Sequence, residues 1–349
     1  MKSLFVSVVG QNDNIGDSVL RRGLITSVHR PPIQLHAYIG ANSDDYVQNV
    51  GLGAQDVVYR DRAQWLSSMR LNRGRGVTSF LANAGEIAQV RGMRHLGAAQ
   101  LRALASVRMR GGALLQSGVG VRHVERSGAG KMSALRFFDV VTWRDADSRA
   151  HAGVGEVSPD WAISTSARSS VEIDPEPRSR IAISLRGDRP APSQSWIDAI
   201  RRFAEERRLT PIIVVQVRRD SQRAEELAAR LSAELVPWQP GVPHAAQERI
   251  VRREFRRSLY VVSDRLHALV IGATEGAGPL GAPPAMSPKL RRTLDPIGVV
   301  DFLTGYDELS YVGISEPAAI AGRVLQIVEQ AHRRLDDLSD VMVRQIVER

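Results

Sequence analysis

Short apolar runs alternate with amphipathic stretches along most of the chain. Residues 4–9 form a continuous apolar run that ends in a glycine and a polar loop, which is typical of a buried parallel strand. Residues 17–28 carry apolar side chains at helical spacing. The same alternation predicts strands at residues 33–39, 56–59, 112–117, 138–143, 180–185, 211–216, 235–237 and 259–263, and a weak one after Pro279. It predicts helices within 63–110 (with a glycine-rich break at 72–76), from near Asp145, and over 195–208, 221–231, 245–258 and 266–275.

This alternation favours an α/β fold with parallel sheets. The chain has 349 residues, enough for two domains at about 150 residues each. Residues 164–180 are rich in Ser, Arg, Pro and acidic side chains and are predicted to be the linker. We therefore expect an N-terminal domain over 1–170, a C-terminal domain over 171–315, and a helical segment over 316–349 that packs back onto the N-terminal domain. Ligands are expected in the cleft between the halves, at the carboxyl ends of the strands.

Composition excludes several classes of protein. The absence of cysteine excludes a disulfide scaffold, an iron–sulfur cluster and a thiol nucleophile. No cluster of side chains has the spacing of metal ligands, so no metal is expected. The N-terminal apolar run is too short for a signal peptide or a membrane helix, and we expect a cytoplasmic protein.

The positive net charge of the chain is only weak evidence about its binding partners. The formal net charge is +9, but only Lys2, Lys131 and Lys289 are lysines, and the remainder of the 47 basic residues are arginines. Such a bias is typical of genomic base composition, and aromatic residues make up only 5% of the chain. We therefore expect no nucleic-acid partner. A positive field of this kind still steers anionic substrates towards a cleft.

Two glycine-containing segments follow or flank predicted strands. In Asn14-Ile15-Gly16-Asp17, the glycine permits a tight turn, and amides at a helix start favour an anion or a sugar hydroxyl. The competing interpretation is that Asp17 is simply the N-cap of the helix. Around residues 111–120, close packing of the glycines is favoured over the approach of a ligand. The sequence contains neither a dinucleotide fingerprint nor a P-loop.

The chemically richest segment is Ser263-Asp264-Arg265-Leu266-His267-Ala268, where a strand turns abruptly into an apolar helix. Arg265 and His267 are predicted in the first turn of that helix, at a ligand-binding edge of the sheet. Histidine is the side chain best suited to transfer a proton near neutral pH. Arg144 also follows a strand, beside the helix-capping Asp145, and its planar fork suits a phosphate or a carboxylate. Lys289 is predicted in a proline-rich loop.

Taken together, Asn14–Asp17, Arg144-Asp145, the block at 263–268 and Pro288-Lys289 resemble the polysaccharide pyruvyl transferases. The resemblance implies two Rossmann-like domains that face each other across a cleft, similar to the glycosyltransferase B architecture. It also implies transfer of pyruvate from phosphoenolpyruvate to a sugar of a cell-surface polysaccharide or its precursor, as a ketal. The N-terminal domain would then bind the acceptor and the C-terminal domain the donor.

Phosphoenolpyruvate carries a phosphate and a carboxylate, for which Arg144, Arg265 and Lys289 are the predicted ligands. His267 is the predicted acid, and Asp17 is expected to help to activate the acceptor hydroxyl. Asn14 and Gly16 are further predicted substrate-binding residues. No cofactor is expected besides phosphoenolpyruvate as co-substrate. The acceptor is expected to be a saccharide, for which both a lipid-linked and a nucleotide-linked form remain open. A lipid-linked acceptor would bring the protein to the inner face of the membrane by peripheral association.

Two other functions remain open from the sequence. A nucleotide-sugar-dependent glycosyltransferase of the same two-domain layout would depend on a diphosphate donor. A non-catalytic glycan-assembly protein would bind ligand without turnover. The acceptor sugar, the oligomeric state and the role of the arginine-rich stretch 63–110 are not predicted.

Overall fold

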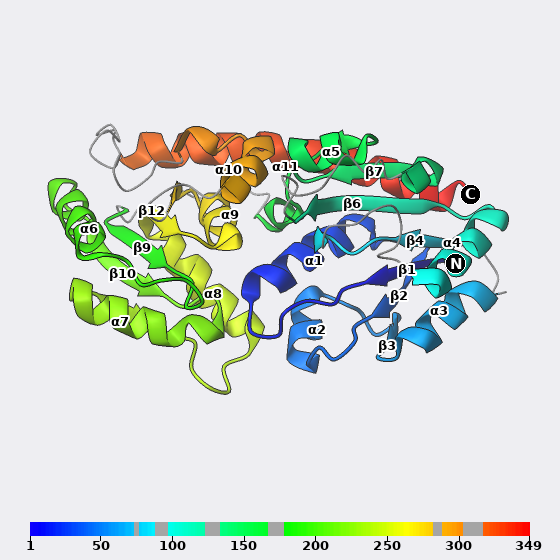
Figure 1. Cartoon of the computed structure of the whole chain (residues 1–349), viewed down its shortest axis with the longest axis horizontal. Helices are drawn as coiled ribbons and strands as arrows, with labels where there is room; N and C mark the ends of the chain where they lie inside the picture. The colour runs from blue at the N-terminus through cyan, green and yellow to red at the C-terminus, as the bar shows by residue number, and fades with distance from the viewer. Residues whose placement is uncertain (73–76, 88–96, 123–132, 167–177, 282–287, 303–316) are drawn as a thin grey trace. The chain divides into compact units, whose positions relative to one another are not determined.

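The computed structural model describes residues 1–72, 77–87, 97–122, 133–166, 178–281, 288–302 and 317–349. The chain forms two compact units, whose strands and helices are labelled in Figure 1. Unit 1 comprises Met1–Asn12, Asp17–Ser164 and His332–Arg349, and unit 2 comprises Asp13–Gly16 and Thr165–Ala331. Most of the predicted linker, residues 167–177, lies outside the described residues.

Unit 1 is built on a parallel sheet with the strand order β3-β2-β1-β4-β6-β7-β8, and β5 pairs with β6. The strands are β1 (Lys2–Ser7), β2 (Ile33–Tyr38), β3 (Val57–Tyr59), β4 (Thr78–Leu81), β5 (Gly85–Ile87), β6 (Leu114–Val121), β7 (Val140–Trp143) and β8 (Glu156–Val157). The helices are α1 (Ile15–Val28), α2 (Asp44–Val50), α3 (Arg62–Leu71), α4 (Gly97–Met109), α5 (Ala146–Ala152) and the last part of α11 (Pro317–Val347). The strand order reverses between β1 and β4, the place where doubly wound sheets bind ligands.

Unit 2 is built on a second parallel sheet with the strand order β11-β10-β9-β12-β13. Its strands are β9 (Arg180–Ser184), β10 (Thr210–Val214), β11 (Glu234–Val236), β12 (Ser258–Ser263) and β13 (Gly278–Gly281). Its helices are α6 (Gln194–Glu206), α7 (Ser221–Leu231), α8 (His244–Arg256), α9 (Leu266–Thr274), α10 (Pro288–Leu294) and the first part of α11. The strand order reverses between β9 and β12, which sets the ligand edge of this unit.

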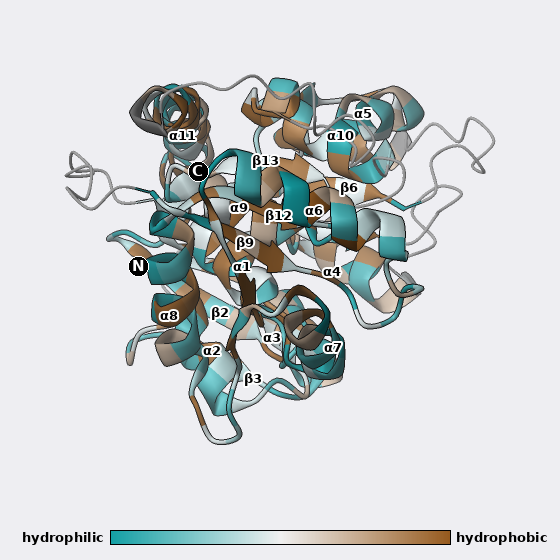
Figure 2. Ribbon diagram, turned by 90° about the vertical axis from the view of Figure 1, so that its left-hand side faces the viewer, coloured by the Kyte–Doolittle hydropathy of each residue, from teal (hydrophilic) through white to brown (hydrophobic). Residues whose placement is uncertain are grey.

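The cores of the two units follow from their strand sequences. In unit 1, Phe5, Trp65 and Phe80 join a buried cluster in which α3 and α4 cover the sheet. In unit 2, nearly every residue of α9 is buried, as its almost wholly apolar sequence requires. Figure 2 shows β9, β12 and α9 in the brown of hydrophobic residues, whereas α7 is largely teal. The α/β class with parallel sheets is thus confirmed.

Residues 63–110 were predicted to be mostly helical, and the helices α3 and α4 at the two ends of this stretch bear that out, but two strands between them were not predicted. Between α3 and α4 the chain forms the short strands β4 and β5. Thr-Ser-Phe-Leu in β4 is buried throughout, so it shows no alternation of apolar and polar side chains. Helix α2 was not predicted either; its N-cap is Ser43, whose side chain accepts a hydrogen bond from the Tyr46 N–H. The weak strand predicted after Pro279 exists as β13, which begins at Gly278 and includes Pro279.

The C-terminal segment is the single long helix α11. Its residues from His332 onwards cluster with unit 1. There the Ser339 hydroxyl donates to the Ser27 carbonyl over 2.5 Å, and Asp340 pairs with Arg30 over 2.7 Å. None of the helices in the described part of the chain is long and apolar enough to span a membrane.

Asp145 is the N-cap of α5, as predicted, and it offers a test of the fold. It is buried, and its carboxylate accepts from the Ser148 N–H over 2.8 Å and from the Ser148 hydroxyl over 2.7 Å. Asp145→Ala is expected to lower the free energy of unfolding by about 1–2 kcal/mol in urea titrations. Asp145→Asn keeps the capping oxygen and should restore most of the loss. Equal losses in the two variants would contradict the capping role.

Candidate active site at the β9–β12 edge

A single buried carboxylate joins three loops of unit 2. Asp220 ends the short 3-10 helix Arg218–Asp220, which follows β10. Its Oδ1 accepts from the Gly187 N–H, in the loop after β9, over 2.8 Å. It also receives the planar fork of Arg265, which follows β12: Nη2 donates to Oδ1 over 2.6 Å and Nε donates to Oδ2 over 2.7 Å. Asp220 and Arg265 are 4% and 9% exposed, so this two-bond ion pair is largely shielded from water.

Further pairs of opposite charge surround this carboxylate. The Arg186 guanidinium donates twice to Asp188, over 2.7 and 2.6 Å, and the Arg186 N–H donates to Asp264 Oδ1 over 2.9 Å. On the other side, Arg219 Nε donates to Asp13 Oδ2 over 2.6 Å. We call these groups the arginine–aspartate cluster, which consists of Asp13, Arg186, Asp188, Arg219, Asp220, Asp264 and Arg265.

The carboxyl groups of the cluster differ in their titration. Hydrogen bonding to Arg186 lowers the pKa of Asp188 to about 2. Burial acts to raise the pKa of Asp13, but the hydrogen bond and the charge of Arg219 outweigh burial and lower this pKa. Burial raises the pKa of Asp264 in spite of the hydrogen bond from the Arg186 N–H. Asp264 is therefore the carboxyl whose surroundings favour the protonated form.

The segment Asp13–Gly16 belongs to unit 2, although it lies near the N-terminus of the chain. Asn14 Oδ1 accepts from Gln216 Nε2 over 3.1 Å and from the Gly16 N–H over 3.0 Å. A Cβ atom built on Gly16 would lie 2.3 Å from the Cβ of His267, so no larger residue fits there without displacing the histidine. The structure thus brings together the segment around Gly16 and the segment around His267, which lie some 250 residues apart in the sequence. We had predicted each of them separately as a candidate site.

His267 stands on a turn that Ser263 shapes. The Ser263 hydroxyl donates to the Ser184 carbonyl over 2.5 Å and accepts from the Arg265 N–H over 2.9 Å. Arg265 is the N-cap of α9 rather than a residue of its first turn, and His267 is the second residue of the helix. His267 is half-buried. The histidine is therefore held beside the arginine–aspartate cluster by its own helix and by Gly16.

Asp17 and Arg144 lie in unit 1. Asp17 is not the N-cap of α1, because the helix begins two residues earlier, at Ile15. Its carboxylate accepts from the Gln11 N–H over 2.9 Å and pairs with Arg21 over 3.3 Å. Arg144 follows β7 as predicted, but its side chain is buried and pairs with Glu86 over 3.2 Å. Gly120 leaves room for it, since a Cβ there would lie 2.4 Å from Arg144 Nε.

Lys289 lies in α10 rather than in a loop, and it is half-buried. Its proline neighbour is the first residue of that helix, a position that suits proline because no N–H is needed there. The predicted roles of Asp17, Arg144 and Lys289 in binding or catalysis stay predictions.

Sequence reasoning missed most of the cluster. Arg186, Asp188, Arg219 and Asp220 were not singled out. Arg-Gly-Asp follows β9 and Arg-Arg-Asp follows β10, so both show the same change from apolar strand to charged turn that drew attention to Arg265. Among the described residues, no group of three or more His, Asp or Glu side chains is arranged to hold a metal ion.

Residues 107–277 match the family model of the polysaccharide pyruvyl transferases. The match spans just under half of the chain and includes Arg144, Arg265 and His267, whereas Asn14–Asp17 and Lys289 lie outside it. The resemblance inferred from the sequence is thereby confirmed. No curated protein sequence matches the chain.

Solved structures resemble the fold at low sequence identity. The UDP-GlcNAc 2-epimerase of Neisseria meningitidis is 12% identical with a TM-score of 0.56, covering 100% of both chains. A protein of Listeria monocytogenes described as a putative UDP-N-acetylglucosamine 2-epimerase is 10% identical with a TM-score of 0.58, covering 100% of this chain and 98% of that one. An O-GlcNAc transferase of Thermobaculum terrenum is 12% identical with a TM-score of 0.53, covering 99% of this chain and 68% of that one. These similarities confirm the fold resembling the glycosyltransferase B architecture.

The contact between Gly16 and His267 predicts a stability effect with a matched control. Gly16→Ala is expected to lower the free energy of unfolding by about 1–3 kcal/mol, because the added methyl group overpacks the site. Gly322→Ala is the control: its Cβ would meet nothing within 4 Å, in the interior of α11. That variant should gain about 0.5–1 kcal/mol from its higher helix propensity. Equal effects in the two variants would contradict the contact.

The raised pKa of Asp264 predicts a stability that depends on pH. A carboxyl whose pKa is higher in the folded than in the unfolded state destabilises the fold once it ionises, as pH rises above its ordinary value of 3.8. Asp264→Asn keeps the acceptor oxygen for the Arg186 N–H and removes the charge. We expect a higher thermal midpoint than wild type at pH 7, with the difference shrinking as pH falls to about 4. A lower midpoint for Asp264→Asn at pH 7 would contradict the sign of the shift.

Proposed function

We propose, from the match of residues 107–277 to the polysaccharide pyruvyl transferases, that this chain transfers pyruvate from phosphoenolpyruvate to a saccharide as a ketal. The observation that carries the proposal is the contact of Gly16 with His267 beside the Arg265–Asp220 pair. This contact joins a small-residue turn, a proton-transfer group and an anion-binding group at the ligand edge of one sheet.

Arg265 is the main residue that binds phosphoenolpyruvate, the pyruvate donor, in this proposal. A guanidinium has five N–H donors in a fixed fork, and the two bonds to Asp220 engage Nε and Nη2. The Nη1 edge is left to bind the phosphate or the carboxylate of phosphoenolpyruvate, in the two-bond geometry that arginine favours. Arg186 is the second residue proposed to bind phosphoenolpyruvate. Its side chain is 29% exposed, and it follows β9 at the same edge of the sheet as Arg265.

The reaction begins with a proton transfer to carbon. The methylene carbon of phosphoenolpyruvate takes a proton, and the neighbouring carbon then carries positive charge. One sugar hydroxyl adds to that carbon and loses its proton, and the carbon–oxygen bond to phosphate breaks. A second hydroxyl adds, loses its proton and closes the ketal ring. The products are the pyruvylated sugar and inorganic phosphate.

His267 is the proposed acid for the first step, since a protonated imidazole can donate a proton and the ring lies beside Arg265. Asn14 and Gly16 present the turn that packs against it, and Asp17 is proposed to help to activate the acceptor hydroxyl. Arg144 and Lys289 are kept as further proposed donor ligands.

The acceptor is proposed to be a sugar of a cell-surface polysaccharide or of its lipid-linked or nucleotide-linked precursor. We propose that the protein acts in the cytoplasm, and at the inner face of the membrane where the acceptor is lipid-linked. Nucleotide-sugar-dependent glycosyl transfer is an alternative outcome of the test below, because it would release a nucleotide instead of phosphate.

Phosphate release from phosphoenolpyruvate in the presence of acceptor glycosides tests the proposal. His267→Gln keeps a hydrogen-bonding side chain but cannot act as an acid near pH 7, and we expect turnover to fall by about 10²–10⁴-fold. Arg265→Lys keeps the charge opposite Asp220 but loses the fork. It should mainly weaken phosphoenolpyruvate binding, by roughly 10–100-fold, as expected for a charge-assisted hydrogen bond.

Thermal midpoints of both variants serve as the folding control, since the two residues share one turn. A well-folded His267→Gln protein with near-normal turnover would refute the acid role. Release of a nucleotide from a nucleotide sugar, without phosphate release from phosphoenolpyruvate, would overturn the proposed reaction in favour of glycosyl transfer.

A further inference from the structure

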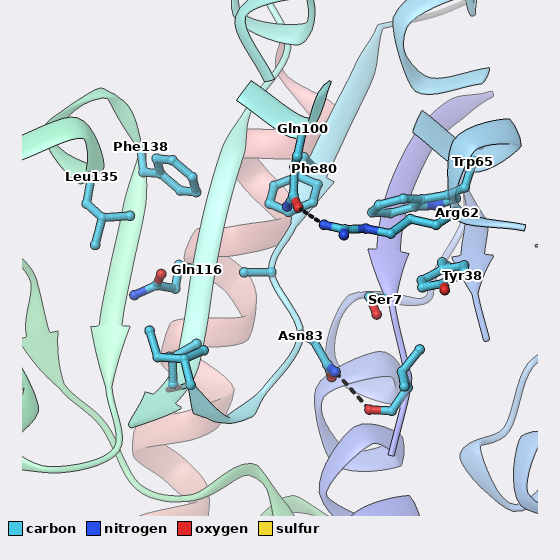
Figure 3. A pocket seen from close by; sticks show the side chains of 14 residues that line it. Ser7, Tyr38, Arg62, Trp65, Phe80, Asn83, Gln100, Gln116, Leu135 and Phe138 are labelled. Atoms are coloured by element: carbon cyan, nitrogen blue, oxygen red, sulfur yellow. Dashed lines mark hydrogen bonds between the residues drawn. The ribbon is translucent and has the colours of Figure 1, made fainter. Parts of the chain in front are cut away.

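Unit 1 contains a cavity of about 370 Å³ at the point where its own strand order reverses, between β1 and β4. Ser7 at the end of β1 and Asn83 just after β4 line it, and Gln116 of β6 lies on the far side. Figure 3 shows these side chains around the cavity, with Phe80 and Trp65 along one wall. The cavity is thus placed where a doubly wound sheet binds its ligand.

Two amide side chains in this cavity each have one buried atom without a hydrogen-bond partner within the described part of the chain. Asn83 Nδ2 donates to the Val9 carbonyl over 2.9 Å, which fixes the orientation of the amide and leaves buried Oδ1 without a partner. Gln116 is 4% exposed, and its buried Nε2 has no partner among the described residues. Buried polar atoms are nearly always hydrogen-bonded in folded proteins, so these two amide atoms are suited to bind a ligand in the cavity. The pair offers one acceptor and one donor.

The other lining groups define the chemistry of that ligand. Tyr38, Trp65 and Phe80 present aromatic surface, and Trp65 lies 5.7 Å from Tyr38 and 6.3 Å from Phe80 between ring centroids. Among the described lining residues the single charged side chain is Arg62, which is exposed and donates to Gln100 Oε1 over 2.7 Å. A largely uncharged interior does not suit a diphosphate or a second phosphoenolpyruvate. It suits a ring that has C–H bonds for the aromatic surface and hydroxyls for the amides.

From these groups we infer that the cavity binds one uncharged sugar residue, with Gln116 and Asn83 bonding to its hydroxyls. Identifying that residue as part of the acceptor rests on the proposed function, but the recognition chemistry stands on the cavity alone. Gln116 is then a specificity-determining residue. Its amide is retained in the core of β6 for the ligand and not for the fold.

Saturation-transfer NMR without phosphoenolpyruvate tests this inference. The probes are the methyl glycosides of glucose, galactose, mannose and N-acetylglucosamine, with uridine as the competing flat heterocycle. At least one glycoside should receive saturation, most strongly at the ring protons of one face. Gln116→Leu should weaken its binding at least about tenfold, because one hydrogen bond in a desolvated site is lost.

The matched control is Gln48→Leu, at an exposed position of α2 away from the cavity, which should bind like wild type. The thermal midpoint of Gln116→Leu should equal or exceed that of wild type, because the variant removes a buried amide without a partner. A purely structural glutamine would instead lower the midpoint and leave sugar binding unchanged.

Three results would overturn the inference: no saturation of any glycoside, binding of uridine in their place, or equal glycoside binding by Gln116→Leu and Gln48→Leu. The outcome is separable from that of the proposed function. Sugar binding that depends on Gln116, without phosphate release from phosphoenolpyruvate, would leave this inference standing and refute pyruvyl transfer. Phosphate release from phosphoenolpyruvate, together with sugar binding that Gln116→Leu does not weaken, would support pyruvyl transfer and refute this inference.

Discussion

The carboxylate of Asp220 is the constraint on which the site of unit 2 depends. The loops after β9, β10 and β12 each end in polar residues that would otherwise take many conformations. Asp220 binds the Gly187 N–H from one loop and both branches of the Arg265 fork from another. Because the pair is buried, removing either partner would leave a charge uncompensated in a poorly solvated place. The orientation of the Arg265 guanidinium follows from this single group, whereas Ser263 and Gly16 set the place of His267.

The arginine–aspartate cluster is organised for orientation more than for net charge. It holds at least one carboxyl for each guanidinium, so the cluster has no local excess of positive charge. The carboxylates instead hold the guanidinium groups in fixed directions before any ligand arrives, which reduces the side-chain entropy lost on binding. The overall charge of +9 supplies the long-range attraction for an anion. The cavity of unit 1 differs from this charged cluster, because aromatic rings and amides line a nearly uncharged interior.

Much of the fold was predictable because buried parallel strands appear in the sequence as continuous apolar runs. The turn at 263–268 was predictable because the sequence changes there from apolar to charged residues. The partners of Arg265 were not predicted, since Asp220 precedes a helix and looks like an ordinary cap in the sequence. Contact between Gly16 and His267 depends on the N-terminal segment joining unit 2, a long-range event that local patterns do not record. Gln116 was part of a segment interpreted through its glycines, so its amide drew no attention. The burial of Gln116 and the lack of a hydrogen-bond partner for its Nε2 among the described residues can be recognised only in the three-dimensional structure.

The central claim is that the Nη1 edge of Arg265, whose guanidinium Asp220 orients, binds the phosphoenolpyruvate anion. Side-chain NMR of the protein with isotope-labelled arginine, titrated with phosphoenolpyruvate, tests it most directly. Arg252 is the internal reference, because it is held in a separate network by Glu248 and Glu275. We predict a saturable shift of the Arg265 Nε–H signal, with little change at Arg252 and no shift in Arg265→Lys, which lacks the group. A saturable response elsewhere that leaves the Arg265 signal in place would contradict the account.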